Sequence, residues 1–334
     1  MFSFPIKAKA FATATLVLSL SFAGLAQADD HPMGDGTSIR LLTNPAGTMS
    51  FPPFVIERFG LEEKYGFQLE PVTYSDENSI IAAIMGDSAD AAAIDWFIMA
   101  RLRQNGVPLL ATVPFLTFVN SVIVPMDSPA QTLADLEDAR FGVHSRAAYD
   151  WLMIQAAARE TYGLDNFASY VQLQEAAVPL LRGLMEQEQL EATQMWNSIA
   201  AAMLTSGEYR TLVSIRDLSE QMGFGAVPYL IYAFDEDFIA EHPETVRAFE
   251  AAMQEVYEIL MTDDSVWEDR GGEMNMSPEA IIAFRDQVRR DITPVFEDDA
   301  EETYFRMFDT LLQTAGEEIL GMNSMPDRLL ATDF

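Results

Sequence analysis

The sequence predicts an α/β protein with two lobes, each built on a mostly parallel sheet flanked by helices. Two observations predict this fold. Apolar runs of strand length alternate with amphipathic helical segments, and the alternation restarts once near the middle of the chain. The length of 334 residues agrees, because a single hydrophobic core seldom grows beyond about 250–300 residues.

The first 28 residues have the pattern of a secretory signal peptide. Lys7 and Lys9 give a basic start, an apolar run follows at residues 10–25, and Ala26-Gln27-Ala28 precedes two aspartates. We expect cleavage after Ala28, so that the mature chain works outside the cytoplasm, free in solution. An uncleaved N-terminal anchor is the alternative, but the apolar run is shorter than the ~20 residues of a membrane span.

The first α/β unit follows a polar tail at residues 29–37. Its expected strands are apolar or alternating and lie at 39–43, 67–73, 89–94 and 108–113. Its expected helices carry apolar residues at helical spacing and lie at 54–65, 79–85 and 96–104. This order of strands and helices implies a mostly parallel sheet that is covered on both faces.

The pattern restarts after an apolar run at 119–124. The second unit has expected strands at 141–143, 170–173, 191–195 and 211–215, and expected helices at 132–137, 147–162, 177–187 and 198–205. Another apolar run at 227–234 ends the unit, and expected helices follow at 243–261, 277–290 and 300–315.

The simplest topology has the chain cross into a second lobe and return. The first lobe then contains residues 38–120 and 233–334, and the second contains residues 121–232. The two apolar runs, near 119–125 and 226–234, are the expected hinge strands.

Composition excludes several classes of protein. The chain has no cysteine, which rules out disulfides, thiolate metal sites and cysteine nucleophiles. It has 52 acidic and 20 basic residues, with a net charge of −32, and such a surface repels nucleic acid and anionic lipid. Acidic residues spread over a whole chain favour solubility in salt and say little about a ligand, because ions screen distant surface charge.

Candidate binding residues lie where strands end, since ligands of open α/β sheets bind at the carboxyl ends of the strands. Helix N-termini at the same edge favour anions. The candidates are Asn44, Thr48, Ser50, Phe51, Asp95, Trp96, Ser145, Arg146, Trp196, Asn197, Tyr229 and Tyr232.

Arg146 is the strongest candidate for binding an anion. A guanidinium at the N-terminal end of the helix expected at 147–162 is unfavourable against the helix dipole, which suggests a ligand there. A bidentate clamp on a sulfonate or carboxylate is one interpretation, and a surface arginine paired with an acidic residue is the other.

The remaining candidates also have structural alternatives. Thr48 and Ser145 fit plain helix capping. Trp96 and Trp196 fit either the wall of a pocket or the core, and Tyr229 and Tyr232 could also be wall residues. The three histidines are scattered and give no zinc pattern, and the chain has no phosphate loop, nucleophile elbow or HExxH motif.

Five spaced segments carry a family resemblance, and the order in which they occur is more specific than any one of them. They are Gly86 to Asp95; Val124 to Pro129 followed by Thr132 to Leu136; Phe141 to Val143; Leu190 to Trp196; and Phe238 to Pro243. In this order they resemble the periplasmic solute-binding proteins of ABC importers, in the nitrate, sulfonate and taurine group. Ser198 stands where the family usually has proline, which leaves the ligand open.

The resemblance implies a two-lobed, type II-like periplasmic-binding-protein fold with a two-strand hinge. It implies a monomer that captures a small anion, closes on it and delivers it to the transmembrane subunits of an ABC permease. No cofactor, nucleic acid or membrane insertion is expected. The open alternatives are an aromatic acid or a thiamine-precursor pyrimidine as ligand, or a periplasmic sensor.

The family's enzyme relatives do not match this chain. They include a pyrimidine synthase with a lysine-bound pyridoxal cofactor and a cysteine-rich motif. Lys64 is the only lysine after the predicted signal peptide, and the chain has no cysteine, so we expect no enzyme activity.

Overall fold

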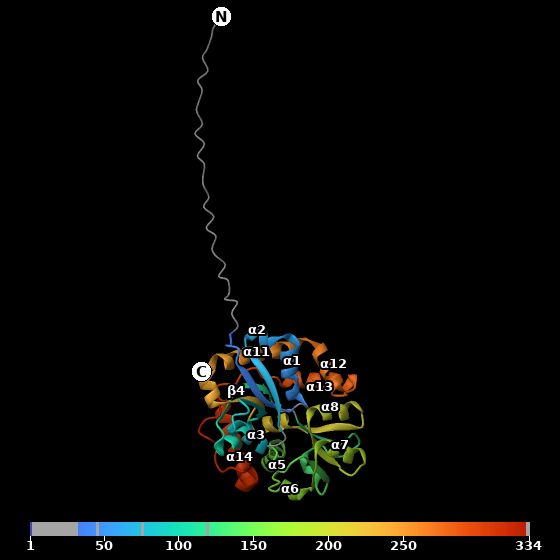
Figure 1. The fold of residues 1–334 in the computed structure, drawn as a ribbon. Helices are drawn as coiled ribbons and strands as arrows, with labels where there is room; N and C mark the ends of the chain where they lie inside the picture. The colour runs from blue at the N-terminus through green and yellow to red at the C-terminus, as the bar shows by residue number, and fades with distance from the viewer. Residues whose placement is uncertain (2–32, 45–46, 75–76, 118–119, 332–334) are drawn as a thin grey trace. The chain divides into compact units, whose positions relative to one another are not determined.

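Two five-stranded sheets organise the computed structural model (Figure 1). The structure describes residue 1 and residues 33–331, apart from 45–46, 75–76 and 118–119. The predicted signal peptide beyond Met1, its cleavage site and most of the polar tail lie outside the described residues.

The first sheet has the strand order β2-β1-β3-β10-β4. Its strands are β1 (Ser38–Thr43), β2 (Gln68–Thr73), β3 (Ala91–Asp95), β4 (Leu109–Leu116) and β10 (Leu230–Asp235). β1 is parallel to β2 and β3, while β10 runs antiparallel to both β3 and β4.

The second sheet repeats this arrangement in the order β7-β6-β8-β5-β9. Its strands are β5 (Ser121–Pro125), β6 (Arg140–Val143), β7 (Gln172–Glu175), β8 (Ala192–Met195) and β9 (Tyr209–Ser214). β6 is parallel to β7 and β8, and β5 is antiparallel to β8 and β9.

In each sheet the single antiparallel strand is the one that arrives from the other sheet. β5 follows β4 of the first sheet, and β10 follows the strands of the second. This confirms the predicted two-lobed α/β fold with mostly parallel sheets. We call each sheet with its helices a lobe; the boundaries of the lobes and the hinge strands stay predictions.

The helices that cover the sheets follow the predicted alternation. They are α1 (Phe51–Phe59), α2 (Leu61–Tyr65), α3 (Glu77–Met85), α4 (Trp96–Gln104), α5 (Tyr149–Tyr162), α6 (Phe167–Tyr170), α7 (Val178–Glu186), α8 (Asn197–Thr205), α9 (Ile215–Gln221), α10 (Glu236–Glu241), α11 (Pro243–Thr262), α12 (Asp264–Glu273), α13 (Pro278–Asp291) and α14 (Ala300–Leu320). Two 3-10 turns, η1 (Thr48–Ser50) and η2 (Leu133–Leu136), complete the elements.

Several predicted elements differ in the structure. The single helix expected at 54–65 is two helices, because Gly60 adopts the left-handed conformation between α1 and α2. The short helix expected at 132–137 is the 3-10 turn η2, and the strand expected at 170–173 lies at 172–175. The short helices α6, α9, α10 and α12 were not predicted, because so few residues give little periodicity.

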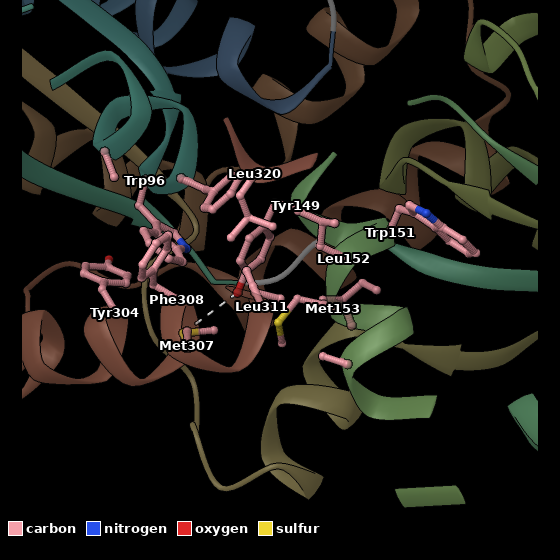
Figure 2. Close-up of a cluster of buried hydrophobic side chains, with 14 of the residues drawn as sticks. Trp96, Tyr149, Trp151, Leu152, Met153, Tyr304, Met307, Phe308, Leu311 and Leu320 are labelled. Carbon is pink, nitrogen blue, oxygen red and sulfur yellow. Dashed lines mark hydrogen bonds between the residues drawn. The ribbon is translucent and has the colours of Figure 1, made fainter. Parts of the chain in front are cut away.

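Helices that follow β10 pack against the helices of the second sheet. α13 contacts α8, and α14 contacts α5 (Figure 1). Figure 2 shows the second of these contacts, where Tyr304, Met307 and Leu311 of α14 lie beside Tyr149 of α5 and Trp96 of α4. The two sheets are thus joined by buried apolar packing as well as by the chain crossings. None of the helices in the described part of the chain is long and apolar enough to cross a membrane.

Candidate functional site

The loop after β1 forms the first part of the candidate site. It turns into η1, where both Thr48 and Ser50 are buried. The Ser50 hydroxyl donates to the carbonyl oxygen of Gly47 at 2.7 Å and accepts from Nε of Arg270 at 3.2 Å. Gly47 has φ 71°, a left-handed conformation that favours glycine, so this tight turn depends on it.

Thr48 and Asn197 join the two lobes. The Asn197 side-chain amide donates to the Thr48 hydroxyl at 2.9 Å, and that hydroxyl lies 3.2 Å from the Asn197 carbonyl oxygen. Thr48 follows β1 of the first sheet, and Asn197 follows β8 of the second. The two side chains are only 5% and 3% exposed. The structure therefore brings together two predicted site residues that are far apart in the sequence.

Asp95 begins α4 at the carboxyl end of β3. Its Oδ1 accepts from the backbone N–H of Ile98 at 2.7 Å, so it caps the helix. Burial raises the pKa of Tyr74 to about 12, and the negative charge of Asp95 contributes to this rise. Burial, followed by the charge of Asp95, raises the pKa of Tyr229 well above the ordinary value. Burial also raises the pKa of Tyr149 well above the ordinary value, and a hydrogen bond with Trp96 opposes this rise.

Aromatic rings continue this contact between the lobes. Tyr149 of α5 stacks on Tyr229, with ring centroids 5.2 Å apart, and meets Trp96 edge-on at 5.4 Å. Trp96 in turn stacks on Tyr304 at 4.6 Å and is fully buried (Figure 2). Trp96 is therefore a core residue, which was one of its two predicted roles. Tyr229 is partly buried and packs against the same core.

Two polar contacts involve segments near β5 and β9 of the second sheet. The amide of Asn120, just before β5, donates to the carboxylate of Asp150 in α5. Nε of Arg216 in α9 donates to Oδ1 of Asp291 at 2.9 Å, at the end of α13. Burial raises the pKa of Asp291, and the neighbouring Arg216 opposes that rise.

Arg146 does not sit where the sequence placed it. The helix begins at Tyr149 rather than at residue 147, because the Ser145 hydroxyl accepts from the backbone N–H of Ala147 at 3.2 Å and a turn precedes the helix. Arg146 is exposed, and its Nε lies 3.4 Å from a carboxylate oxygen of Glu175. It also lines a cavity of about 240 Å³ beside α14. Because Arg146 is exposed and pairs with Glu175, it fits the interpretation of a surface arginine paired with an acidic residue. Ser145 fits a local turn.

Trp196 is exposed, at 37%. Its ring meets His144 edge-on, with centroids 5.5 Å apart. The Gln194 amide nitrogen lies 2.9 Å from Nδ1 of His144, and the buried Gln194 carbonyl oxygen has no hydrogen-bond partner among the described residues. These groups lie at the carboxyl ends of β6 and β8.

Phe51 and Tyr232 belong to the core of the first lobe. Phe51 packs on Trp267 with centroids 4.7 Å apart, and Tyr232 packs between Phe115 and Phe249. Neither side chain is exposed, so both residues pack in the core and do not face a site where a ligand could bind, contrary to the prediction.

A cavity of about 870 Å³ opens beside this edge of the first lobe, and two predicted residues, Asn44 and Ser50, line it. Thr43, Phe54 and Arg270 line it as well, and sequence reasoning missed all three. No local signal could have found Arg270, because it lies 220 residues from Ser50, which it contacts. Among the residues that the structure describes, no group of three or more His, Asp or Glu side chains could hold a metal ion.

The two sheets and their helices define a two-lobed α/β fold of the periplasmic-binding-protein type. A family model described as "NMT1/THI5 like" matches residues 61–265, more than half of the chain. The protein therefore belongs to the NMT1/THI5-like family, which confirms the resemblance predicted from the sequence. A search of curated proteins gives no significant match.

Solved structures support the same fold at low sequence identity. The periplasmic aliphatic sulphonate binding protein SsuA from Escherichia coli has a TM-score of 0.70 at 14% identity, covering 89% of this chain and 95% of its own. The alkanesulfonate-binding protein SsuA from Xanthomonas axonopodis pv. citri bound to MOPS has a TM-score of 0.65 at 13% identity, with 83% and 94% covered. The periplasmic nitrate-binding protein NrtA from Synechocystis PCC 6803 has a TM-score of 0.50 at 11% identity, with 71% and 66% covered.

Proposed function

We propose that this protein is the solute-binding component of an ABC importer. It is exported to the periplasm through a signal peptide cleaved after Ala28, works there as a monomer, and carries no enzyme activity or cofactor. It captures a small solute between its lobes and delivers it to the transmembrane subunits of a permease.

The observation that carries this proposal is the side-chain pair between Thr48 and Asn197. These residues lie at the carboxyl ends of strands in different sheets, which is where ligands of open α/β sheets bind. A solute that touches both edges binds the closed arrangement better than the open one and shifts the population toward it. The chain crossings near 119–125 and 226–234 would supply the hinge.

The solute that we propose is a small anion of the sulfonate, taurine or nitrate type, with a thiamine-precursor pyrimidine or an aromatic acid as the alternative. The names of the sulfonate-binding and nitrate-binding neighbours support an anion. Arg146 does not support it, since it is exposed and pairs with Glu175. The described residue that does is Arg270, whose guanidinium reaches the loop after β1.

Thermal shift followed by small-angle scattering tests the proposal. The chain is produced with its leader, recovered from the periplasm, and screened with small anions, amines and pyrimidines. A solute that binds only the folded chain stabilises it by about 2.7 kcal/mol at 100 times its Kd. We expect at least one compound to raise Tm and to reduce the radius of gyration. A particle that neither gains stability nor contracts with any compound, or a leader that stays uncleaved in the cytoplasm, contradicts the proposal.

A further inference from the structure

Helix α14 is interrupted near its end, at Gly316. This residue has φ 79° and ψ 164°, a backbone conformation that is nearly restricted to glycine. A Cβ atom added there would meet no other atom within 4 Å, so the backbone conformation and not crowding requires glycine. The interruption separates residues 300–315 from the last helical turn at residues 317–320. The chain on either side of it can therefore follow different partners.

The part of α14 before the interruption packs against the second lobe. Nη1 of Arg159, near the end of α5, donates to the carbonyl oxygen of Gln313 at 2.7 Å. At the start of α5, the Tyr149 hydroxyl donates to the sulfur of Met307 at 3.8 Å (Figure 2). This part of the helix thus follows α5, although residues 233–334 were predicted to belong to the first lobe.

The chain after the interruption is fixed to the first lobe. Nε of Arg103 in α4 donates to the carbonyl oxygen of Arg328 at 2.6 Å. The backbone N–H of Ala111 in β4 donates to the carbonyl oxygen of Leu329, and the N–H of Ala331 donates to that of Ala111, both at 2.9 Å. These bonds attach the end of the described chain to β4, which is an edge strand of the first sheet.

The start of α14 is also held by the first lobe. Oε1 of Glu301 accepts from the backbone N–H of Leu329 at 2.5 Å. Tyr304 stacks on Trp96 of α4 with ring centroids 4.6 Å apart. The helix thus begins on the first lobe, passes onto α5 of the second, and returns to the first after the interruption (Figure 1). We call residues 300–315, which span the two lobes, the strap.

A cavity of about 240 Å³ lies beside the interruption, between the strap and the second lobe. Thr314 and Ala315 line it from the strap, and Ile319 lines it from the turn that follows. Trp151 and Phe167 line it from α5 and α6. Protein interiors are otherwise close-packed, so this space allows the end of the strap to move over the second lobe without displacing packed side chains.

We propose that the strap holds the two lobes together, and that Gly316 is the pivot at which it releases the second lobe while the chain after it stays on the first. Release breaks the bond between Arg159 and the Gln313 carbonyl oxygen. The proposal rests on the proposed function, to which it adds a third connection beside the predicted hinge strands. The apparent affinity for a solute falls with the fraction of the protein in the binding-competent state. Weakening the strap therefore weakens binding without any contact to the solute.

Distances between spin labels in the ligand-free chain test whether the strap holds the lobes. The chain has no cysteine, so labels can be attached to introduced cysteines alone. Glu63 of α2 and Leu180 of α7 are exposed, and labels at these positions report the separation of the lobes. Arg159→Gln should lengthen this distance or broaden its distribution. Arg103→Gln is the matched control, because it removes a similar bond to Arg328 within the first lobe, and it should leave the distribution unchanged.

A second pair of variants tests the pivot. Gly316→Ala should lengthen the distance between the labels at Glu63 and Leu180 as Arg159→Gln does, because alanine disfavours the backbone conformation that the attached strap requires. Gly321→Ala is the control, since Gly321 also has a positive φ, of 70°, but lies after the strap. This control should lower Tm and leave the distance unchanged.

Each outcome supports or overturns the proposal. If Arg159→Gln has the distance distribution of the original chain, or if Arg103→Gln lengthens the distance equally, the strap does not hold the lobes. If a folded Gly316→Ala chain keeps the original distribution, Gly316 is not the pivot.

These distances are measured without a solute, so they judge the strap even if no solute is found and the proposed function fails. With a solute found in the thermal-shift screen, Arg159→Gln should weaken the affinity about threefold or more in calorimetry, and Arg103→Gln should not. An unchanged affinity in Arg159→Gln would show that the strap does not act on closure, and the proposed function would stand without it.

Discussion

The Thr48 hydroxyl should matter for ligand binding more than for folding. Thr48→Val keeps the shape of the side chain and removes the group that accepts from the Asn197 amide at 2.9 Å. In the closed arrangement both residues are nearly inaccessible to water, so the amide is left buried and unpaired. If the lobes separate when no solute is bound, water can hydrogen-bond to the amide, and the substitution does not destabilise the open form.

The size of the effect follows from this difference. A buried polar group without a partner costs about 1–3 kcal/mol. The Asn197 carbonyl oxygen keeps its bond from the backbone N–H of Ser198 at 2.8 Å, so only the amide is affected and the lower part of that range applies. A penalty of about 1–1.4 kcal/mol on the closed form weakens the apparent affinity about five- to tenfold. The Tm of the ligand-free chain should stay nearly constant.

Calorimetry with a solute found in the thermal-shift screen, together with melting curves with and without that solute, measures both quantities. Thr245→Val is the matched control, because this buried hydroxyl of α11 donates to Asp35, in the segment before β1, at 2.7 Å. It should lower Tm and leave the affinity unchanged. If Thr48→Val instead lowers the ligand-free Tm as much as the control does and leaves the affinity intact, the pair is permanent and the reasoning about closure is refuted.

Two further predictions concern stability. Arg216→Gln removes the positive partner of the buried Asp291 and should lower the free energy of unfolding by about 2 kcal/mol or more in urea titrations. Adding Asp291→Asn to the same chain should recover part of the loss. An unchanged urea midpoint for Arg216→Gln would show that the pair does not stabilise the fold. Burial raises the pKa of Glu250 from 4.5 to about 7, so the folded state favours the protonated carboxyl and stability is lost as the pH rises from 4.5 to 7. Glu250→Gln should therefore raise Tm at pH 8 and have little effect at pH 4.5, and an equal effect at both pH values would contradict the assigned cause.

The elements were predictable where their signals are local. β1, β3 and α4 were found within two residues because apolar periodicity and glycine ends act over a few residues. The start of α5 was placed two residues early, since a turn at Ser145 competes with the helix. That small error placed Arg146 directly at the N-terminal end of a helix and made it the strongest candidate for an anion clamp.

The aromatic candidates show a different limit. Three aromatic candidates lie shortly after the carboxyl end of a strand, namely Phe51, Trp96 and Trp196. Phe51 and Trp96 are fully buried, whereas Trp196 is 37% exposed. A sequence position after a strand gives the edge of the sheet but not the direction in which the side chain points. That direction depends on which helix packs there, and for Trp96 the neighbour is Tyr304, more than 200 residues away.

The sequence alone determined that the chain forms two α/β units with mostly parallel sheets, because alternation and periodicity are properties of neighbouring residues. It also determined which loops lie at the carboxyl ends of the strands, and so proposed Thr48 and Asn197 separately. Only the tertiary structure decided that these two side chains meet and that Arg270 rather than Arg146 reaches the loop after β1. Such contacts join segments distant in the chain, and they are fixed by packing of whole elements rather than by local preference.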